Sequence, residues 1–238
     1  YTTLFRSSYG QTKVFAVTGV QGALTCGSSN PAVATASVSG KSIVVNGVSV
    51  GTAIITVKAG ETQSYKASNE LKLSINVLPA ATTSLKAENQ AKGIKLTWAA
   101  VNGANGYIVY RNGAVVATIQ GGATVKYVDK GANTNGAKYT FAVAAKAASG
   151  TSPLSTSIVT YKVARPSISS VKNTASKKTT VKWKKNSKAT GYVIQYSLKK
   201  NFKSGVKKVT MKKKATVSKL IKSLKKGKTY YFRIQTYK

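Results

Sequence analysis

Clustered lysines are the residues of this chain whose type and spacing could do chemistry, namely attraction of negatively charged polymers. The clusters lie in the last third of the sequence. The candidate polyanion-binding residues are Lys177, Lys178, Lys184, Lys185, Lys207, Lys208, Lys212, Lys213, Lys214, Lys225 and Lys226. An ammonium group is a mobile point charge, whereas the arginine fork suits shaped recognition of phosphate, so these lysines favour diffuse attraction over specific docking.

The whole chain is strongly basic, with 38 lysines and arginines against four acidic residues and a net charge of +34. The charge rises from +3 over residues 8–79 to +7 over 80–163 and +23 over 164–238, a module without any acidic residue. A short lysine run is usually a solvated face, but a whole acid-free module exceeds that explanation. Such a field draws polyanions and opposes compaction by self-repulsion.

Residues that catalyse reactions or bind metals are scarce in the sequence. There is no histidine, there is one cysteine, and the four acids are scattered. Zinc sites, histidine-based triads and the carboxylate pairs of glycosidases all need such residues close together. We therefore expect no enzyme activity, no metal and no cofactor. Cys26 has no partner for an intrachain disulfide, and we expect it to pack in a core rather than to react.

A repeated pattern indicates the elements that carry the lysines. Trp98 is followed eight residues later by a Gly-Tyr pair, and the same pattern returns 85 residues further on at Trp183. This offset is the size of a small domain, so the chain repeats a module. Alternating apolar residues around both tryptophans predict β-strands. Asn46-Gly47 and Asn112-Gly113 each predict a tight hairpin turn, because Asn-Gly accepts the two positive φ angles of such a turn.

Two segments in the first 79 residues carry a family signature. Segment 28–35 reads Ser-Ser-Asn-Pro-Ala-Val-Ala-Thr, and segment 51–57 reads Gly-Thr-Ala-Ile-Ile-Thr-Val. With these segments, residues 8–79 resemble the bacterial immunoglobulin-like domain, group 2. The chain departs from the family at Cys26, where an aromatic residue is common, and at Ile54, where threonine is common. The resemblance implies a β-sandwich.

A second pattern recurs in residues 84–163 and 164–238. A tryptophan lies on an early strand, Gly-Tyr opens the next, and a late tyrosine, Tyr139 or Tyr230, follows a turn; residues 224–230 read Leu-x-x-Gly-x-x-Tyr. In these features both modules resemble the fibronectin type III domain. The resemblance implies that the tryptophans and the Gly-Tyr tyrosines pack in the core. It also implies that the late tyrosine hydroxyl bonds back to the backbone at a corner.

Three further tyrosines leave carbohydrate binding open as an alternative function of the surface. Tyr110, Tyr196 and Tyr231 could face outward, and two or three coplanar exposed rings would suit a carbohydrate. The sequence does not decide whether these rings are exposed.

We predict an all-β chain of three tandem immunoglobulin-like and fibronectin type III β-sandwiches, the last one truncated. The expected domains are a bacterial immunoglobulin-like group 2 domain over 8–79, a fibronectin type III domain over 80–163, and a Lys-rich fibronectin type III domain over 164–238 that lacks its last strand. Residues 1–7 read like a translated sequencing adapter and are expected to be an artefact. The short linkers 79–83 and 163–166 are expected to be cleaved first by proteases.

Such strings of modules are similar to those in surface or secreted proteins of Gram-positive, Clostridia-like bacteria. The resemblance implies a non-catalytic spacer or stalk at the bacterial cell surface or cell wall, outside the cell. Its lysines would attract anionic cell-wall polymers. The alternative is an adhesin or accessory module that binds carbohydrate or a host surface ligand, or that flanks a carbohydrate-active enzyme domain.

Two further expectations concern partners. Nucleic acid is not expected as a physiological partner, because no nucleic-acid-binding motif accompanies the charge. We expect monomeric modules, and no apolar run in the sequence is long enough to span a membrane.

Overall fold

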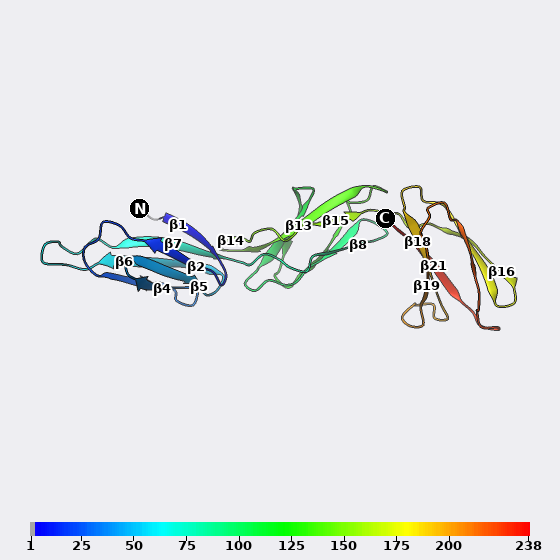
Figure 1. The fold of residues 1–238 in the computed structure, drawn as a ribbon, viewed down its shortest axis with the longest axis horizontal. Coiled ribbons are helices and arrows are strands. Elements are labelled where there is room, and N and C mark those ends of the chain that lie inside the picture. Colours follow the sequence, from blue (N-terminus) through cyan, green and yellow to red (C-terminus); the bar gives the residue numbers. More distant parts are fainter. Residues whose placement is uncertain (1–2) are drawn as a thin grey trace. The chain divides into compact units, whose positions relative to one another are not determined.

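The computed structural model describes residues 3–238, with side chains from Phe5 on. The regular secondary structure assigned in that range consists of β-strands (Figure 1). The strands form six sheets, which make three β-sandwiches in sequence order. The described residues include no helix that is long and apolar enough to cross a membrane. The all-β prediction with three tandem sandwiches is confirmed.

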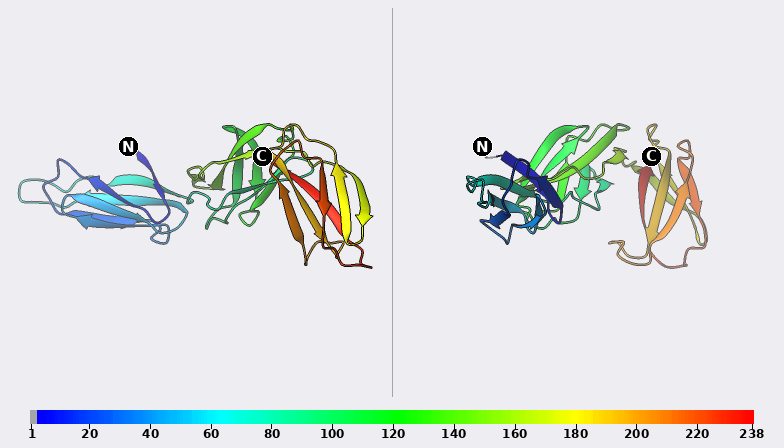
Figure 2. Two further views of the ribbon diagram at one scale, coloured as in Figure 1. Left: turned by 45° about the vertical axis from the view of Figure 1, so that its right-hand side comes forward. Right: turned by 60° about the vertical axis from the view of Figure 1, so that its left-hand side comes forward.

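The chain separates into two compact units. The first comprises residues 1–87, 96–127 and 140–158, and the second comprises 88–95, 128–139 and 159–238. The N-terminal sandwich therefore belongs to the first unit and the C-terminal sandwich to the second, whereas both units contain residues of the middle sandwich. Figure 2 shows the strands of each sandwich from two further sides.

The N-terminal sandwich packs a four-stranded sheet, in the order β1-β7-β6-β3, against a three-stranded sheet, β2-β5-β4. Its strands are β1 (Thr3–Ser8), β2 (Thr12–Ala16), β3 (Leu24–Ser28), β4 (Ala34–Ser39), β5 (Ser42–Gly47), β6 (Gly51–Ala59) and β7 (Leu71–Leu78). On β7, Leu73, Ile75 and Val77 point into the core, as the alternation in the sequence predicts.

Strand β1 contains most of the segment whose sequence reads like an adapter; residues 1 and 2 of that segment lie outside the described residues. Residues 3–8 pair in parallel with β7. Phe5 packs against the core, and its ring meets that of Phe15 edge to face at a centroid distance of 4.5 Å. The described part of the segment therefore supplies a strand to the sandwich.

The predicted hairpin at Asn46-Gly47 is wrong. Both residues lie within β5, and the following strand, β6, belongs to the opposite sheet. The backbone at Gly47 lies close to the opposite sheet: a Cβ placed there would lie 3.1 Å from a methyl carbon of Val77, a contact tight enough that the Val77 side chain would have to shift. Asn46 accepts a hydrogen bond from the Thr12 hydroxyl at 2.6 Å, which joins β5 to β2.

The middle sandwich has a sheet in the order β11-β10-β13-β14, with β15 also paired to β13, and a second sheet β12-β9-β8. Its strands are β8 (Lys86–Asn89), β9 (Ile94–Thr97), β10 (Gly106–Arg111), β11 (Ala114–Gln120), β12 (Lys126–Asp129), β13 (Lys138–Ala147), β14 (Gly150–Thr151) and β15 (Ile158–Tyr161). Here the Asn-Gly prediction is confirmed: Asn112 and Gly113 have φ values of 51° and 85° and join the antiparallel strands β10 and β11.

The C-terminal sandwich packs the sheet β16-β17-β20 against the sheet β19-β18-β21. Its strands are β16 (Ile168–Ala175), β17 (Lys178–Trp183), β18 (Gly191–Ser197), β19 (Lys207–Met211), β20 (Ser218–Ile221) and β21 (Tyr231–Tyr237). In the middle sandwich the late strand β13 is covered by β15, but its counterpart β21 is the outer strand of its sheet within the described chain.

The repeated tryptophan and tyrosine form the same core contact in both copies. Trp98 meets Tyr107 edge to face at 5.3 Å, and Trp183 meets Tyr192 at 5.5 Å. All four side chains are buried. The predicted core role of these residues is therefore confirmed.

The late tyrosines form the predicted corners. The Tyr139 hydroxyl accepts a hydrogen bond from the backbone N–H of Thr134 at 3.3 Å. The Tyr230 hydroxyl accepts one from Lys225 at 3.2 Å. In both sandwiches the donor lies five residues upstream, so the corner closes the turn that leads into the late strand.

Candidate polyanion interface

Every candidate lysine of the C-terminal sandwich is exposed. The exposure extends to all other lysines of residues 164–238 as well. No acidic residue occurs in this segment, so its lysines have no side-chain carboxylate of their own module to pair with. Their charge therefore faces solvent without internal compensation.

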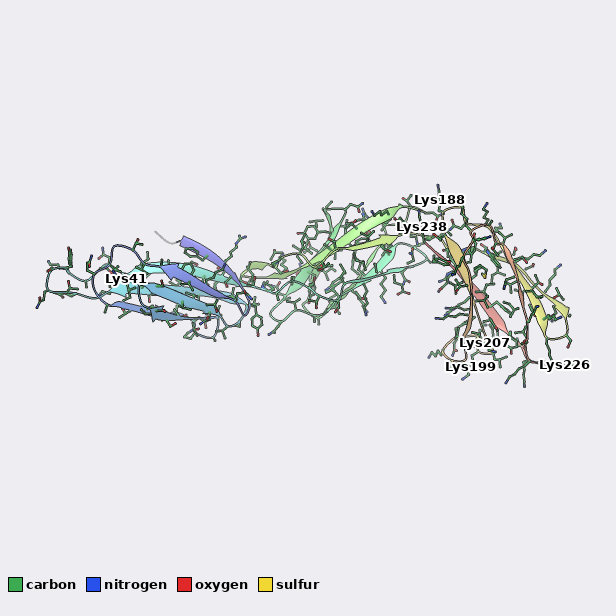
Figure 3. All side chains as sticks on the ribbon, in the orientation of Figure 1. Lys41, Lys188, Lys199, Lys207, Lys226 and Lys238 are labelled. Atoms are coloured by element: carbon green, nitrogen blue, oxygen red, sulfur yellow. The ribbon has the colours of Figure 1, made fainter. Side chains whose placement is uncertain are left out.

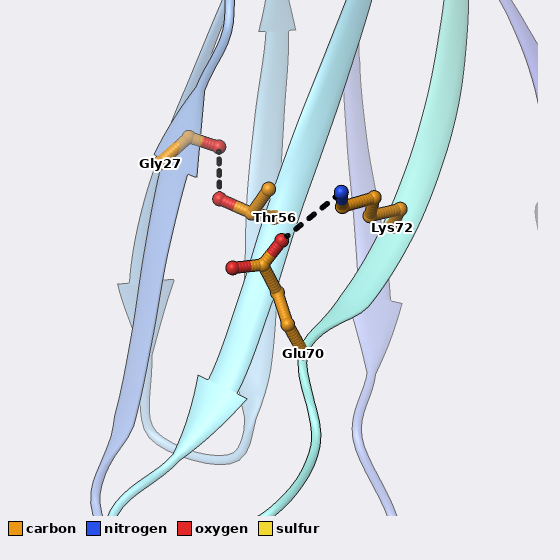
Figure 4. A network of polar contacts seen from close by, with 4 residues as sticks. All are labelled: Gly27, Thr56, Glu70 and Lys72. Atoms are coloured by element: carbon orange, nitrogen blue, oxygen red, sulfur yellow. Dashed lines mark hydrogen bonds and ion pairs between the residues drawn. The ribbon is translucent and has the colours of Figure 1, made fainter.

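An ion pair in the N-terminal sandwich shows the contrast. Lys72 lies 3.6 Å from a carboxylate oxygen of Glu70, beside the Thr56 to Gly27 hydrogen bond that links β6 and β3 (Figure 4). The side chains of Lys72 and Glu70 are 60% and 50% exposed, so water screens their attraction and the pair contributes little stability. Its effect is to neutralise one lysine, which no acid does in residues 164–238.

The structure divides the candidate lysines between the two ends of the C-terminal sandwich. Strand directions bring loops 184–190 and 212–217 to one end, and turn 176–177 with loops 198–206 and 222–230 to the other. Figure 3 shows Lys188 at the first end and Lys199, Lys207 and Lys226 toward the second. The two groups of candidates are Lys184, Lys185, Lys212, Lys213 and Lys214 at the first end, and Lys177, Lys178, Lys207, Lys208, Lys225 and Lys226 toward the second.

The first end contains an open cavity of about 570 Å³. We call it the cradle, and its lysines are Lys188, Lys212, Lys213, Lys214 and Lys238. Lys188 and Lys238 are absent from the sequence-based set. The lysines of that set are adjacent in the sequence, whereas these two stand singly and join the others only through the fold.

The second end contains a groove of about 600 Å³ beside strands β16 and β21. Lys177, Lys178, Lys225, Lys226 and Lys228 line it together with apolar side chains. Its apolar lining is formed by Val171, Leu224, Tyr230 and Phe232. Val171 is 45% exposed although it pairs with the buried Val181.

Two basic residues of this sandwich are held by contacts with other residues. The Lys238 ammonium donates to the Gly136 carbonyl at 3.2 Å and lies 4.7 Å from the centre of the Tyr161 ring. Arg233 is held within the sandwich. The Arg233 side chain donates to the Gln195 side-chain oxygen at 2.5 Å, and its guanidinium lies 4.3 Å from the centre of the Phe202 ring. Stacking on an aromatic ring is a common use of arginine. This arrangement joins loop 198–206 to the outer face of the β19-β18-β21 sheet.

Lys162 is a lysine outside the surface set, because it is only 2% exposed. Its ammonium donates to the backbone carbonyl of Gln90 at 2.5 Å and to that of Gly93 at 3.3 Å. Burial lowers the pKa of Lys162, and the charge of Tyr139 acts in the opposite direction. Nothing in the sequence distinguishes Lys162 from an exposed strand lysine, and its charge serves the turn between β8 and β9.

The structure does not favour an aromatic carbohydrate platform in the fibronectin-like modules. Tyr196 is buried and stacks on Phe232 inside the core. Tyr110 and Tyr231 are half-buried. Among the described aromatic residues, the exposed ones are Tyr9 and Tyr65, which both lie in the N-terminal sandwich.

The other candidate chemistry also finds no assembled site. No group of three or more potential metal ligands gathers among residues 3–238. Cys26 is half-buried and packs against the core of the N-terminal sandwich, which agrees with the predicted packing role, and burial raises the pKa of its thiol.

Comparisons with known proteins find a family model that matches one module. Residues 164–238 match the fibronectin type III domain. Among solved structures, the chain is similar to the crystal structure of the chicken CNTN1 FN1–FN3 domains, with a TM-score of 0.43, 17% identity, and coverage of 96% of this chain and 92% of that one. A two-domain fibronectin type III segment of chicken tenascin is similar with a TM-score of 0.32, 18% identity, and coverage of 66% and 91%.

The comparison with curated proteins returned no match for this chain. The family match thus agrees with the fibronectin type III prediction for the Lys-rich module. The predictions for residues 8–79 and 80–163 continue to rest on their own motifs.

Proposed function

We propose that this chain is a non-catalytic spacer or stalk segment of a bacterial surface or secreted protein, and that residues 164–238 hold it against anionic cell-wall polymers such as teichoic acids. The observation that carries the proposal is the set of exposed lysines in a module of net charge +23 without an acid. Fibronectin type III modules are typically extracellular, which fits this location.

The predominance of lysine over arginine in residues 164–238 favours diffuse attraction over shaped recognition. Of the 23 basic residues in the module only Arg165 and Arg233 are arginine, and the Arg233 side chain is engaged by Gln195 and Phe202. Attraction by mobile ammonium groups arises largely from the release of counterions, so it should weaken steeply with added salt. It should also discriminate little among flexible polyanions.

Binding of the full chain to purified teichoic acid, neutral wall glycan and DNA tests the proposal, with salt varied from about 50 to about 500 mM. We expect binding to teichoic acid at low salt, loss at high salt and no binding to the neutral glycan. Binding to the glycan that survives high salt would support the adhesin or accessory-module alternative. No binding to teichoic acid at low salt would leave only a spacer.

A further inference from the structure

The two fibronectin-like sandwiches hold their end loops with the same tyrosine. In the middle sandwich the Tyr107 hydroxyl accepts from the Val101 backbone N–H at 3.1 Å and donates to the Gly122 carbonyl at 2.8 Å. In the C-terminal sandwich the Tyr192 hydroxyl accepts from the Asn186 N–H at 2.8 Å and donates to the Lys214 carbonyl at 3.1 Å. One buried hydroxyl thus ties the loop before its own strand to a second loop of the same sandwich.

The loops held by these two tyrosines differ in charge. Loops 99–105 and 121–125 of the middle sandwich contain no charged residue. The corresponding loops of the C-terminal sandwich, 184–190 and 212–217, contain six lysines. Because the same tyrosine contacts hold the uncharged loops of the middle sandwich, these contacts do not need lysine. The charge at this end therefore distinguishes the C-terminal sandwich from the middle one.

Hydrogen bonds fix the backbone of both lysine loops. The Asn186 side chain, buried at 8% exposure, accepts from the Lys188 backbone N–H at 3.0 Å. The Thr216 N–H donates to the Lys213 carbonyl at 3.1 Å and closes a turn. The loops are therefore held while the exposed lysines line the cavity, with the stem of Lys188 close to Gly136, and this brings several like charges to one concave place. Such a concentration is the arrangement that raises the local density of a counter-ion.

We propose that the cradle is the primary contact of the C-terminal sandwich for a flexible phosphodiester polymer of the cell wall, with Lys188, Lys212, Lys213 and Lys214 on its phosphates. This inference rests on the proposed function and narrows it from the whole module to one end. The cradle lining contains no arginine and no aromatic side chain. It thus lacks the bidentate fork that reads base edges and the rings on which bases stack. A polymer of phosphates and polyols needs neither.

The test compares two full-chain variants that lose the same charge. The cradle variant carries K188Q, K212Q, K213Q and K214Q. The control variant carries K172Q, K182Q, K219Q and K222Q, which are exposed lysines on or next to the β16-β17-β20 sheet. Both variants lose four positive charges, and all eight positions are at the surface, so folding should be retained. Binding to purified teichoic acid and to DNA is measured for both, with wild type as reference.

We expect the cradle variant to bind teichoic acid at least about tenfold more weakly than the control variant at about 50 mM salt. Its slope of log affinity against log salt should fall by about 3, since each lost phosphate contact removes about 0.7. Equal losses of teichoic acid affinity in the two variants would overturn the proposal that the cradle is the primary contact, but would leave the proposed function standing. Absence of wild-type binding would overturn the proposed function itself. A larger loss for DNA than for teichoic acid would overturn the polymer class.

Discussion

The Tyr192 hydroxyl offers a stability test that can be worked from the structure. Tyr192 is fully buried, and Asn186, whose N–H it accepts, is also buried. Tyr192→Phe would leave that N–H without a partner in a buried place. The Lys214 carbonyl, which belongs to an exposed residue, can be rehydrated. A buried donor left unpaired costs about 1–3 kcal/mol, so we expect the substitution to destabilise the C-terminal sandwich by about 2 kcal/mol.

Tyr107→Phe is the matched control in the middle sandwich. The groups left behind there, the Val101 N–H and the Gly122 carbonyl, belong to half-buried residues that water can reach after small movements. We therefore expect a smaller loss, about 1 kcal/mol. The two substitutions remove the same hydroxyl oxygen. A difference between their losses of stability therefore reports how deeply the hydrogen-bond partners of that hydroxyl are buried.

Tryptophan fluorescence can follow each sandwich separately, because the chain has two tryptophans, Trp98 in the middle and Trp183 in the C-terminal sandwich. Urea unfolding of Tyr192→Phe is followed in a Trp98→Phe background, and that of Tyr107→Phe in a Trp183→Phe background. At about 2 kcal/mol per molar urea, the Trp183 midpoint should fall by about 1 M. A loss for Tyr192→Phe no larger than that for Tyr107→Phe would refute the reasoning from burial.

Three other expectations follow from single residues or loops. Burial lowers the pKa of Lys162 below its ordinary value of 10.5, so between the folded and the unfolded pKa the unfolded chain binds more protons, and this group makes stability rise with pH in that window. The free energy of unfolding of wild type minus that of Lys162→Met should therefore increase with pH over the same range. A difference that does not change with pH would contradict this expectation. Packing and a raised thiol pKa predict that a maleimide labels Cys26 at least about tenfold more slowly in the native chain than in urea; equal rates would show an open thiol. A nonspecific protease should cut the exposed loop 60–69 before the linker 79–83, because Thr82 in that linker is buried and donates to the Val143 carbonyl at 2.9 Å; first cleavage at 79–83 would favour the expectation from sequence.

Local patterns predicted the strands and the core well, because they depend on neighbours in the chain. The Trp and Gly-Tyr repeat gave the core pair of each fibronectin-like sandwich, and Asn112-Gly113 gave a hairpin. Asn46-Gly47 looks the same in sequence, yet it lies within strand β5, where Gly47 is close to Val77 of the opposite sheet. A contact between residues so far apart in the chain leaves no local signal.

The candidate interface could be predicted only in part for a similar reason. Exposure of the lysines followed from composition, but their separation to two ends depends on strand directions. The cradle residue Lys188 is a single lysine that the fold brings beside Lys212–Lys214. Lys162 shows the opposite case, since nothing in the sequence marks it, yet the fold buries it among backbone carbonyls. In both cases the deciding partners are distant in the sequence.

The outer strand β19 has a consequence for how copies of this chain behave on a polymer. An open strand edge offers unpaired backbone groups to any other open edge, and lysines on it prevent such pairing by repulsion. Strand β19 is an outer strand of the sheet β19-β18-β21 in the described chain, and it carries the exposed Lys207 and Lys208. A polyanion that neutralises them removes the repulsion and leaves the backbone groups in place. Copies gathered along one polymer chain would therefore lose the repulsion that keeps them apart where they are most concentrated, so attachment and clustering would occur together.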